Sequence, residues 1–151
     1  MRRAKIAEAA SLTELALRSK AYWGYDAAFM ALCRAELTVQ PAAIAQGEVW
    51  VADDGKGVVG LLEVVSTGSS AEVRLMFVAP EHIGSGIGGA LWRQAEARAR
   101  SLGAVRMELD ADPNAVPFYE RMGMRIIGES PSGSIPGRSL PRMRKALTLP
   151  K

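Results

Sequence analysis

The stretch from Val78 to Leu91 constrains the fold of this 151-residue chain more than any other. Three short glycine groups, Gly84, Gly86 and Gly88-Gly89, separate an alternating apolar segment from a helical one. Glycine lacks a Cβ, so the backbone there can turn sharply and its amides can approach a ligand closely. The first amides of a helix have no intrahelical acceptor and attract anions. The stretch therefore predicts a strand, a tight turn and a helix whose N-terminus binds a phosphate-bearing ligand.

Two known phosphate-binding loops can be compared with this stretch. A Walker loop needs Lys and then Ser or Thr after its last glycine, and Ala90-Leu91 supplies neither. The dinucleotide fingerprint Gly-x-Gly-x-x-Gly is present from Gly84 to Gly89. However, the strand before it ends a meander rather than opening a βαβ unit, and little chain remains for a second nucleotide-binding half. A dinucleotide-binding domain is thus the less favoured alternative.

The periodicity of the remaining chain predicts an α+β fold. A first helix is expected to begin with a capping box of Ser11 and Glu14, and a second to span roughly Asp26 to Glu36, where Pro41 bars its continuation. Asp54-Gly55 between two apolar runs predicts a hairpin with a type I′ turn. Strands are expected at about 49–52, 58–65, 72–78, 105–110, 124–127 and 143–149, with helices at about 87–102 and 112–121.

Composition narrows the class of protein. The formal charge is +3, and the five basic residues from Ser130 onward (Arg138, Arg142, Arg144, Lys145 and Lys151) leave 3 − 5 = −2 for the rest, so general nucleic-acid binding is unlikely. The single cysteine, Cys33, excludes a disulfide framework and a Cys-based zinc cluster, and no metal site is predicted. No apolar run reaches the ~18 residues of a membrane span. We expect a single domain over residues 1–151 in the cytoplasm.

Two motifs resemble those of the GCN5-related N-acetyltransferases (GNAT family). The coenzyme A signature of that family is Gln or Arg, two residues, Gly, any residue, then Gly or Ala; Gly86-Ile87-Gly88 fits its second part, whereas Ile83 departs from Gln or Arg. About 25 residues further on, Asn114 to Gly123 is similar to the second signature, an Asn-containing helix with Phe-Tyr-Glu and Gly. Met124 takes the place of the common Phe. The resemblance covers roughly Glu72 to Met124.

The resemblance implies a mixed, mostly antiparallel sheet of about six to seven strands, flanked by about four helices. The sheet would splay at its middle, between strands 72–78 and 105–110, and hold acetyl-CoA in the opening. Backbone groups of Phe77 and Val78 would bind the pantetheine arm. Asn114 and Tyr119 would complete the coenzyme site. The diphosphate would lie on the amides of Ile83, Gly84, Ser85, Gly86, Ile87, Gly88 and Gly89.

The implied activity is transfer of acetyl from acetyl-CoA to an amine by direct attack in a ternary complex. Tyr119 would protonate the leaving thiolate, and Glu72 would be the base, with a solvent-facing carboxylate paired with Arg74 as the equal alternative for Glu72. Tyr22, Trp23, Tyr25 and Arg138 are candidate acceptor-binding residues. A homodimer is possible in this family. A nonenzymatic coenzyme A-binding domain is the alternative function.

Overall fold

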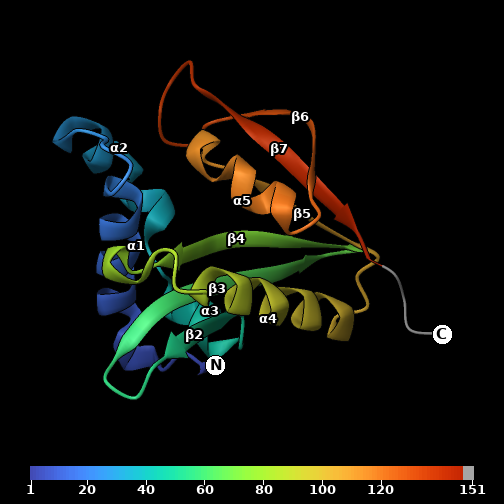
Figure 1. Cartoon of the computed structure of the whole chain (residues 1–151), viewed down its shortest axis with the longest axis horizontal. Helices are drawn as coiled ribbons and strands as arrows, with labels where there is room; N and C mark the ends of the chain where they lie inside the picture. The colour runs from blue at the N-terminus through green and yellow to red at the C-terminus, as the bar shows by residue number, and fades with distance from the viewer. Residues whose placement is uncertain (148–151) are drawn as a thin grey trace. The chain divides into compact units, whose positions relative to one another are not determined.

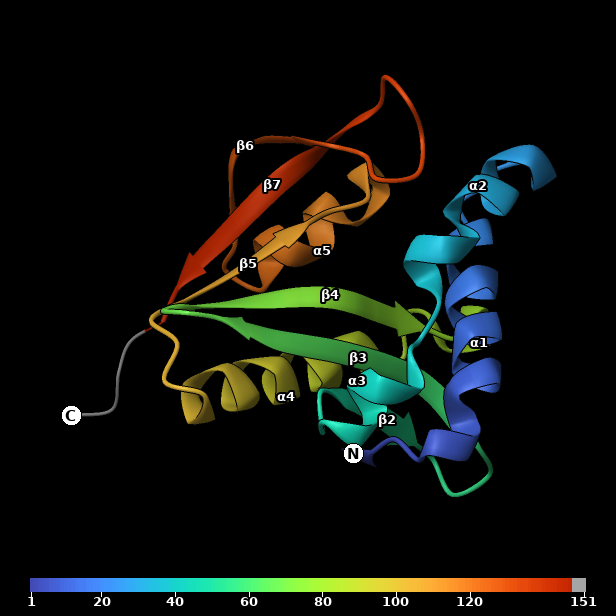
Figure 2. The same cartoon turned by 180° about the vertical axis from the view of Figure 1, so that it is seen from behind.

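The computed structural model describes residues 1–147 (Figures 1 and 2). The chain divides into two compact units. Unit 1 comprises Met1–Glu63 and Leu75–Leu91, and unit 2 comprises Val64–Arg74 and the chain from Trp92 onward. Two strands and one helix run from one unit into the other. The expectation of a single domain stays a prediction, and Leu149 and Lys151, which the sequence places in or after the last strand, lie outside the described residues.

The predicted strands and helices appear in the expected order, and the structure adds a short first strand and a third helix. The elements are β1 (Arg2–Arg3), α1 (Ala9–Ala21), α2 (Ala27–Leu37), α3 (Pro41–Ala45), β2 (Val49–Asp53), β3 (Val58–Thr67), β4 (Ser70–Val78), α4 (Ile87–Ser101), β5 (Arg106–Asp110), α5 (Val116–Arg121), β6 (Arg125–Pro131) and β7 (Ser139–Ala146). Short 3₁₀ turns cover Ile6–Glu8, Pro80–His82 and Pro113–Ala115. The seven strands form one sheet in the order β1-β2-β3-β4-β5-β7-β6. The predicted fold class, a mostly antiparallel sheet flanked by helices, is confirmed.

In unit 1, β2 pairs with β1 and β3 in antiparallel fashion, and α1 packs against α2. The predicted hairpin between β2 and β3 is present, but the type I′ turn is wrong. Such a turn needs positive φ at both central residues, and only glycines have positive φ here, among them Gly55 at +89°. Asp54 instead accepts hydrogen bonds from the amides of Lys56 and Gly57, which stabilises a longer loop.

The predicted starts of two helices differ from the structure. The helix α1 begins at Ala9, ahead of the predicted Ser11–Glu14 box, where the 3₁₀ turn of Ile6–Glu8 leads directly into it. The Glu8 carboxylate caps that 3₁₀ turn by accepting a hydrogen bond of 2.8 Å from the Lys5 amide, and α1 itself has no side-chain cap. Pro41 was expected only to prevent the second helix from continuing. It does more, since its fixed φ suits the first position of a helix and it opens the short helix α3.

Glu8 also forms a bidentate ion pair with Arg2, with two N–O distances of 2.9 Å. The hydrogen bonds from Arg2 are the main cause that lowers the pKa of Glu8 to about 2. A depressed carboxyl pKa stabilises the fold above the unfolded value and loses that effect as pH falls through the folded value. We therefore expect Glu8→Gln to lower the free energy of unfolding by about 1–2 kcal/mol at pH 7, after allowance for solvent screening, and by much less near pH 2.5.

Urea denaturation at the two pH values measures this difference. The control is Glu14→Gln, because Glu14 and Arg34 form an exposed pair at 3.0 Å, and its removal should cost less than about 0.5 kcal/mol. Equal stability of the two variants at pH 7 would contradict the role given to Glu8.

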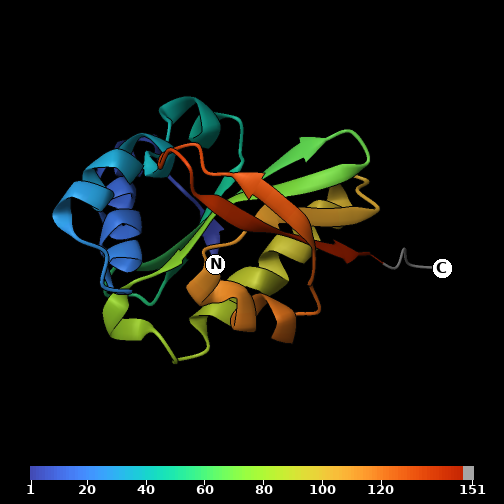
Figure 3. The ribbon, with the colours of Figure 1, turned by 90° about the horizontal axis from the view of Figure 1, so that it is seen from above.

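In unit 2, β7 lies between β5 and β6 and pairs with both in antiparallel fashion. The helix α5 lies along one face of these three strands (Figure 3). The parallel ladder between β4 and β5 runs from Ser70–Arg106 to Glu72–Glu108, so it occupies the first three residues of each strand. The buried side chains of this unit include Val73, Trp92, Met107, Leu109 and Met143. Of these, Val73, Met107, Leu109 and Met143 lie on the face opposite to Glu72, Glu108, Asp110, Arg142 and Arg144, because side chains alternate along a strand.

Within residues 1–147, no helix combines the length and the apolar character that a bilayer span requires.

Candidate active site

The turn between β4 and α4 has the backbone that the glycines predict. The Ala79 amide donates to the Val59 carbonyl oxygen at 2.8 Å and holds the start of the turn on β3. Gly84 and Gly86 then have φ values of +87° and +88°, a region that side-chain-bearing residues rarely adopt. These two glycines reverse the chain so that the helix begins at Ile87.

Several amides of this turn have no backbone acceptor. The Ala90 amide donates to the Gly86 carbonyl oxygen at 3.2 Å, so Gly86 precedes the first helical turn. The amides of Ile87, Gly88 and Gly89 are therefore the first of the helix and lack an intrahelical acceptor. A Cβ added at Gly84 or at Gly86 would meet no atom within 4 Å, which means that open space lies against this backbone. Helix-terminal amides next to a turn with open space at Gly84 and Gly86 fit a diphosphate group.

The start of α4 is seated closely on the sheet of unit 1 at Gly60 of β3. A Cβ at Gly60 would lie 2.9 Å from Leu91 and 3.2 Å from both Ile87 and the Phe77 carbonyl oxygen. Only glycine leaves room for the helix to approach this strand so closely. Sequence reasoning missed Gly60, although an isolated glycine inside an apolar strand is a signal for a close backbone approach.

Tyr119 of α5 is buried, with 7% of its surface exposed. Its ring packs edge-on against Trp92 at 5.9 Å and against Phe118 at 5.2 Å. Burial raises the pKa of Tyr119, and the negative charge of Asp112 raises it further. Among residues 1–147, no group forms a hydrogen bond with its hydroxyl. Tyr119 thus carries a protonated hydroxyl without a partner inside the described chain.

A polar network fixes the neighbours of Tyr119. Trp92 donates from its indole nitrogen to Glu96, and Lys145 of β7 forms an ion pair with the same carboxylate at 2.5 Å. Lys145 also donates to the Met122 carbonyl oxygen at 2.8 Å, at the end of α5. The network therefore ties α5 to β7 and to the unit 2 part of α4, and it restricts where the Tyr119 ring can lie.

Glu72 belongs to a charged group on one face of β4, β5 and β7, which we call the carboxylate–arginine cluster. Its members are Glu72, Glu108, Asp110, Arg142 and Arg144. The strand register assembles it, because Glu72 lies beside Glu108 in the parallel ladder and β7 places Arg144 and Arg142 opposite Glu108 and Asp110. The alternative reading of Glu72 named Arg74 as its partner; the structure places Arg142 against it.

The Arg142 guanidinium is shared among three carboxylates. One terminal nitrogen donates to both Glu72 oxygens at 2.7 and 3.0 Å and to Asp110 at 3.1 Å, and the other donates to Glu108 at 2.9 Å. Burial raises the pKa of Glu72 and outweighs the opposing effect of Arg142. For Glu108, which is also desolvated, hydrogen bonds from Arg144 and Arg142 together lower the pKa. Two neighbouring carboxylates thus differ in their readiness to take up a proton.

The candidate acceptor-binding residues lie in different surroundings. Tyr22 and Trp23, at the end of α1, are 55% and 43% exposed and contact each other edge-on at 5.5 Å. Tyr25 stacks on Phe29 at 4.1 Å. Arg138 precedes β7, and its amide donates to the Ile135 carbonyl oxygen at 3.2 Å.

The predicted coenzyme residue Asn114 directs its side-chain amide to the Asp112 carboxylate at 3.0 Å. The predicted site residues divide between the two units: Phe77, Val78, Ile83 to Gly89, Tyr22, Trp23 and Tyr25 belong to unit 1, and Glu72, Asn114, Tyr119 and Arg138 belong to unit 2.

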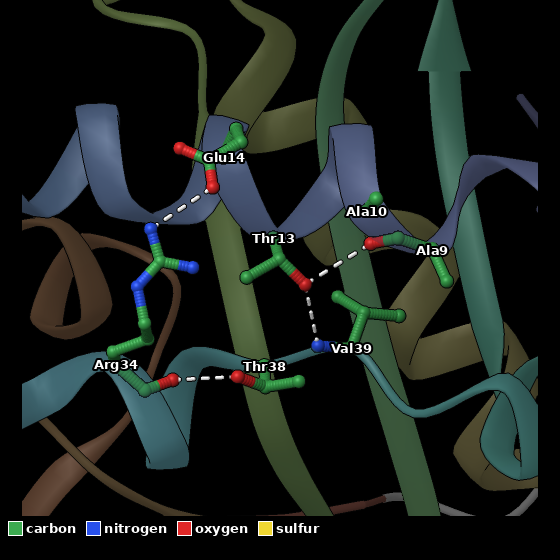
Figure 4. Close-up of a pocket in the computed structure, with 7 residues that line it drawn as sticks. All are labelled: Ala9, Ala10, Thr13, Glu14, Arg34, Thr38 and Val39. Carbon is green, nitrogen blue, oxygen red and sulfur yellow. Dashed lines mark hydrogen bonds and ion pairs between the residues drawn. The ribbon is translucent and has the colours of Figure 1, made fainter.

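A pocket of about 220 Å³ lies in unit 1 (Figure 4). It is lined by Ala9, Ala10, Thr13, Glu14, Arg34, Thr38 and Val39. The Thr13 hydroxyl donates to the Ala9 carbonyl oxygen at 3.0 Å and accepts from the Val39 amide at 2.9 Å. Glu14 pairs with Arg34, and Thr38 donates to the Arg34 carbonyl oxygen at 2.7 Å. Because these polar groups form hydrogen bonds with one another, we interpret the pocket as a structural contact between α1 and the segment after α2, rather than as a ligand site.

Comparison with known families identifies the family of the chain. A family model described as the acetyltransferase (GNAT) domain matches residues 23–147. The chain belongs to this family. Membership confirms the predicted resemblance, and with the mostly antiparallel sheet it excludes the dinucleotide-binding alternative. A search of curated protein sequences finds no match.

Solved structures share the fold of this GNAT chain at low identity. The PaiA N-acetyltransferase of Thermoplasma acidophilum, in complex with coenzyme A, has a TM-score of 0.78 and 19% identity over 97% of each chain. A GCN5-related N-acetyltransferase of Rhodopseudomonas palustris has a TM-score of 0.77 and 21% identity, over 97% of this chain and 94% of the other. The yncA protein of Salmonella typhimurium, with its cofactor acetyl-CoA, has a TM-score of 0.70 and 20% identity, over 99% and 94%.

Proposed function

We propose that this GNAT protein is an N-acetyltransferase that moves the acetyl group of acetyl-CoA to an amine of a small molecule or peptide. Family membership supports acetyl transfer, and the coenzyme A and acetyl-CoA complexes of similar structures support the donor. The observation that carries the proposal is the turn before α4, where two glycines of positive φ and the first helical amides lie beside open space.

Each part of acetyl-CoA would have its own partners. The diphosphate would bind the amides of Gly84 and of Gly86 to Gly89. The amides of Ile83 and Ser85, which were expected to join them, donate instead to the carbonyl oxygens of Pro80 and His82 at 3.4 and 3.2 Å. The backbone of Phe77 and Val78 would hold the pantetheine arm, and Asn114 would contribute a polar contact. The thioester supplies an activated acyl group.

The proposed chemistry moves two protons. The acceptor amine must be neutral to attack, whereas a lysine-like amine has a pKa near 10.4 and is almost wholly protonated at pH 7. Glu72 would accept the amine proton as the C–N bond forms and the C–S bond breaks. Tyr119 would donate its proton to the departing thiolate, whose ordinary pKa is about 8.5. The raised pKa of Glu72 suits a group that takes up a proton. The raised pKa of Tyr119 keeps its hydroxyl protonated at neutral pH, although it does not strengthen the hydroxyl as an acid.

Direct attack of the amine on the thioester is preferred to a covalent enzyme intermediate. The only cysteine of the chain, Cys33, is 3% exposed on α2. A buried thiol cannot reach a thioester without local unfolding. Exposed aromatic side chains, Tyr22 and Trp23, together with Arg138, would contact the acceptor.

Thiol release from acetyl-CoA tests the proposed function. The protein is incubated with acetyl-CoA and a panel of amines, polyamines and amino acids, and free thiol and acetylated product are measured by absorbance and mass spectrometry. We expect at least one amine to raise thiol release well above hydrolysis, with a matching acetylated product. Coenzyme A binding without release for any amine would favour the nonenzymatic alternative.

We also propose that the protein forms a homodimer and is located in the cytoplasm. The strand β6 is at the edge of the sheet and exposes Ile126 and Ile127 by 51% and 40%, a surface that a second copy could cover. Light scattering of the purified protein distinguishes monomer from dimer.

A further inference from the structure

We propose that Arg142 is the positioning residue of Glu72: its guanidinium, shared with Asp110 and Glu108, fixes the Glu72 carboxylate on β4 and still lets it exchange a proton. This inference rests on the proposed function, in which Glu72 accepts the proton of the acceptor amine. It concerns a residue of β7 that sequence reasoning counted only as part of a basic C-terminal segment.

The geometry gives Arg142 control over the orientation of Glu72. A single guanidinium nitrogen lies 2.7 and 3.0 Å from the two Glu72 oxygens, so both oxygens are held at once. Both side chains are mostly covered, with Glu72 24% and Arg142 22% exposed. Charge-assisted hydrogen bonds of this length are roughly twice as strong as neutral ones. Glu72 therefore has one preferred position.

This arrangement differs from a simple ion pair because three carboxylates share the Arg142 guanidinium. In an isolated Glu–Arg pair, protonation of the glutamate would leave a partly buried cation without a partner, which is costly. Here Asp110 and Glu108 stay on Arg142 at 3.1 and 2.9 Å when Glu72 is neutral. Protonation of Glu72 therefore does not leave Arg142 without a negative partner, and burial can raise the pKa of Glu72 despite the nearby cation.

Other charged side chains also lie on the same face of the sheet as Glu72. The groups on its face of β4, β5 and β7 are Arg74, Arg106, Glu108, Asp110, Arg142 and Arg144. Arg144 contacts Glu108 at 2.6 Å and Arg106 contacts it at 3.6 Å, so these cations act mainly on Glu108. The groups that bear most directly on Glu72 are Arg142, which stabilises its charged form, and Asp110, which opposes it.

Two variants should move the pKa of Glu72 in opposite directions. In Arg142→Met the loss of the cation should raise it by about 1 unit, and in Asp110→Asn the loss of a negative neighbour should lower it by a smaller amount. The pKa is measured by NMR titration of ¹³C-labelled glutamate carboxyls, with Glu72→Gln to assign the signal. The control is Arg125→Met, because Arg125 is an exposed arginine on β6 opposite Arg144, and it should leave the titration unchanged.

The pH dependence of kcat/KM, with the amine found in the thiol assay, gives the second readout. A base must be deprotonated, so the acidic limb of the pH profile should follow the pKa of Glu72. In Arg142→Met the limb should move up by about 1 pH unit, which makes kcat/KM ~10-fold lower at pH values below the limb. In Asp110→Asn the limb should move to lower pH. Arg142→Lys keeps the charge and should restore most of the shift, but not the full kcat, because one ammonium nitrogen cannot take the place of two guanidinium nitrogens that bind Glu72 and Glu108 separately.

An unchanged Glu72 titration in both Arg142→Met and Asp110→Asn overturns the proposal. If the NMR pKa of Glu72 shifts in the variants while the acidic limb of the kcat/KM profile stays fixed, Glu72 is not the base. The positioning role of Arg142 in the reaction is then overturned as well. Neither result touches the acetyl-transfer assignment, which fails only if the wild-type protein releases no thiol with any amine.

Discussion

Gly86→Glu is expected to weaken coenzyme A binding by about 100-fold or more, the largest effect of any single substitution in this account. A glutamate there would place a negative side chain in the open space beside the amides that we assign to the diphosphate, and two like charges in close contact repel strongly. Isothermal titration calorimetry with coenzyme A measures the loss.

The chain offers a closely matched control for this substitution. Gly55, in the loop between β2 and β3, has a φ of +89° against +88° for Gly86, and a Cβ at either position would meet no atom within 4 Å. Gly55→Glu therefore introduces the same charge and a similar backbone strain away from the turn. We expect it to bind coenzyme A like the wild type, and equal binding by both variants would contradict the assigned site.

Tyr119→Phe is expected to lower kcat by about 100-fold while the affinity for coenzyme A stays within a factor of about two. Removal of a general acid from the transition state costs 10²–10⁴-fold in rate. The ring keeps its contacts with Trp92 and Phe118 in this variant. Steady-state kinetics with the amine found in the thiol assay measures kcat, and calorimetry measures the coenzyme A affinity.

Thermal unfolding supplies the control for Tyr119→Phe. No hydrogen bond within residues 1–147 holds the Tyr119 hydroxyl, so its removal should leave the melting temperature nearly unchanged. A variant that turns over as fast as the wild type would remove Tyr119 from the mechanism. A large loss of melting temperature would show that the hydroxyl has a structural role instead.

Local signals in the sequence predicted most of the fold. Glycines mark turns and helix ends by their own backbone conformation, and Gly84, Gly86 and Gly103 have the positive φ that such positions require. The β2–β3 hairpin and the α4 helix follow from alternation and helical spacing in the same way. Helix starts were predicted less accurately, since a 3₁₀ turn over Ile6–Glu8 runs directly into α1 and the helix begins at Ala9, ahead of the predicted Ser11 cap.

The carboxylate–arginine cluster could not have been predicted in this way. Glu72 and Arg142 are 70 residues apart, and they meet because β7 pairs with β5 in one particular register. A shift of that register by one residue would send Arg142 to the opposite face of the sheet. The sequence shows that charges alternate along each strand, but it does not show which charges lie opposite one another.

The central claim is that the amides of the turn before α4 bind the diphosphate of coenzyme A. An ¹⁵N–¹H NMR titration of the protein with coenzyme A tests it residue by residue, with pantetheine, which lacks the diphosphate, as the comparison ligand. We predict that coenzyme A shifts the amide signals from Gly84 to Gly89 most strongly and saturably, and that pantetheine leaves those signals nearly unmoved. Largest shifts elsewhere in the chain, or no shifts at millimolar coenzyme A, would contradict the claim.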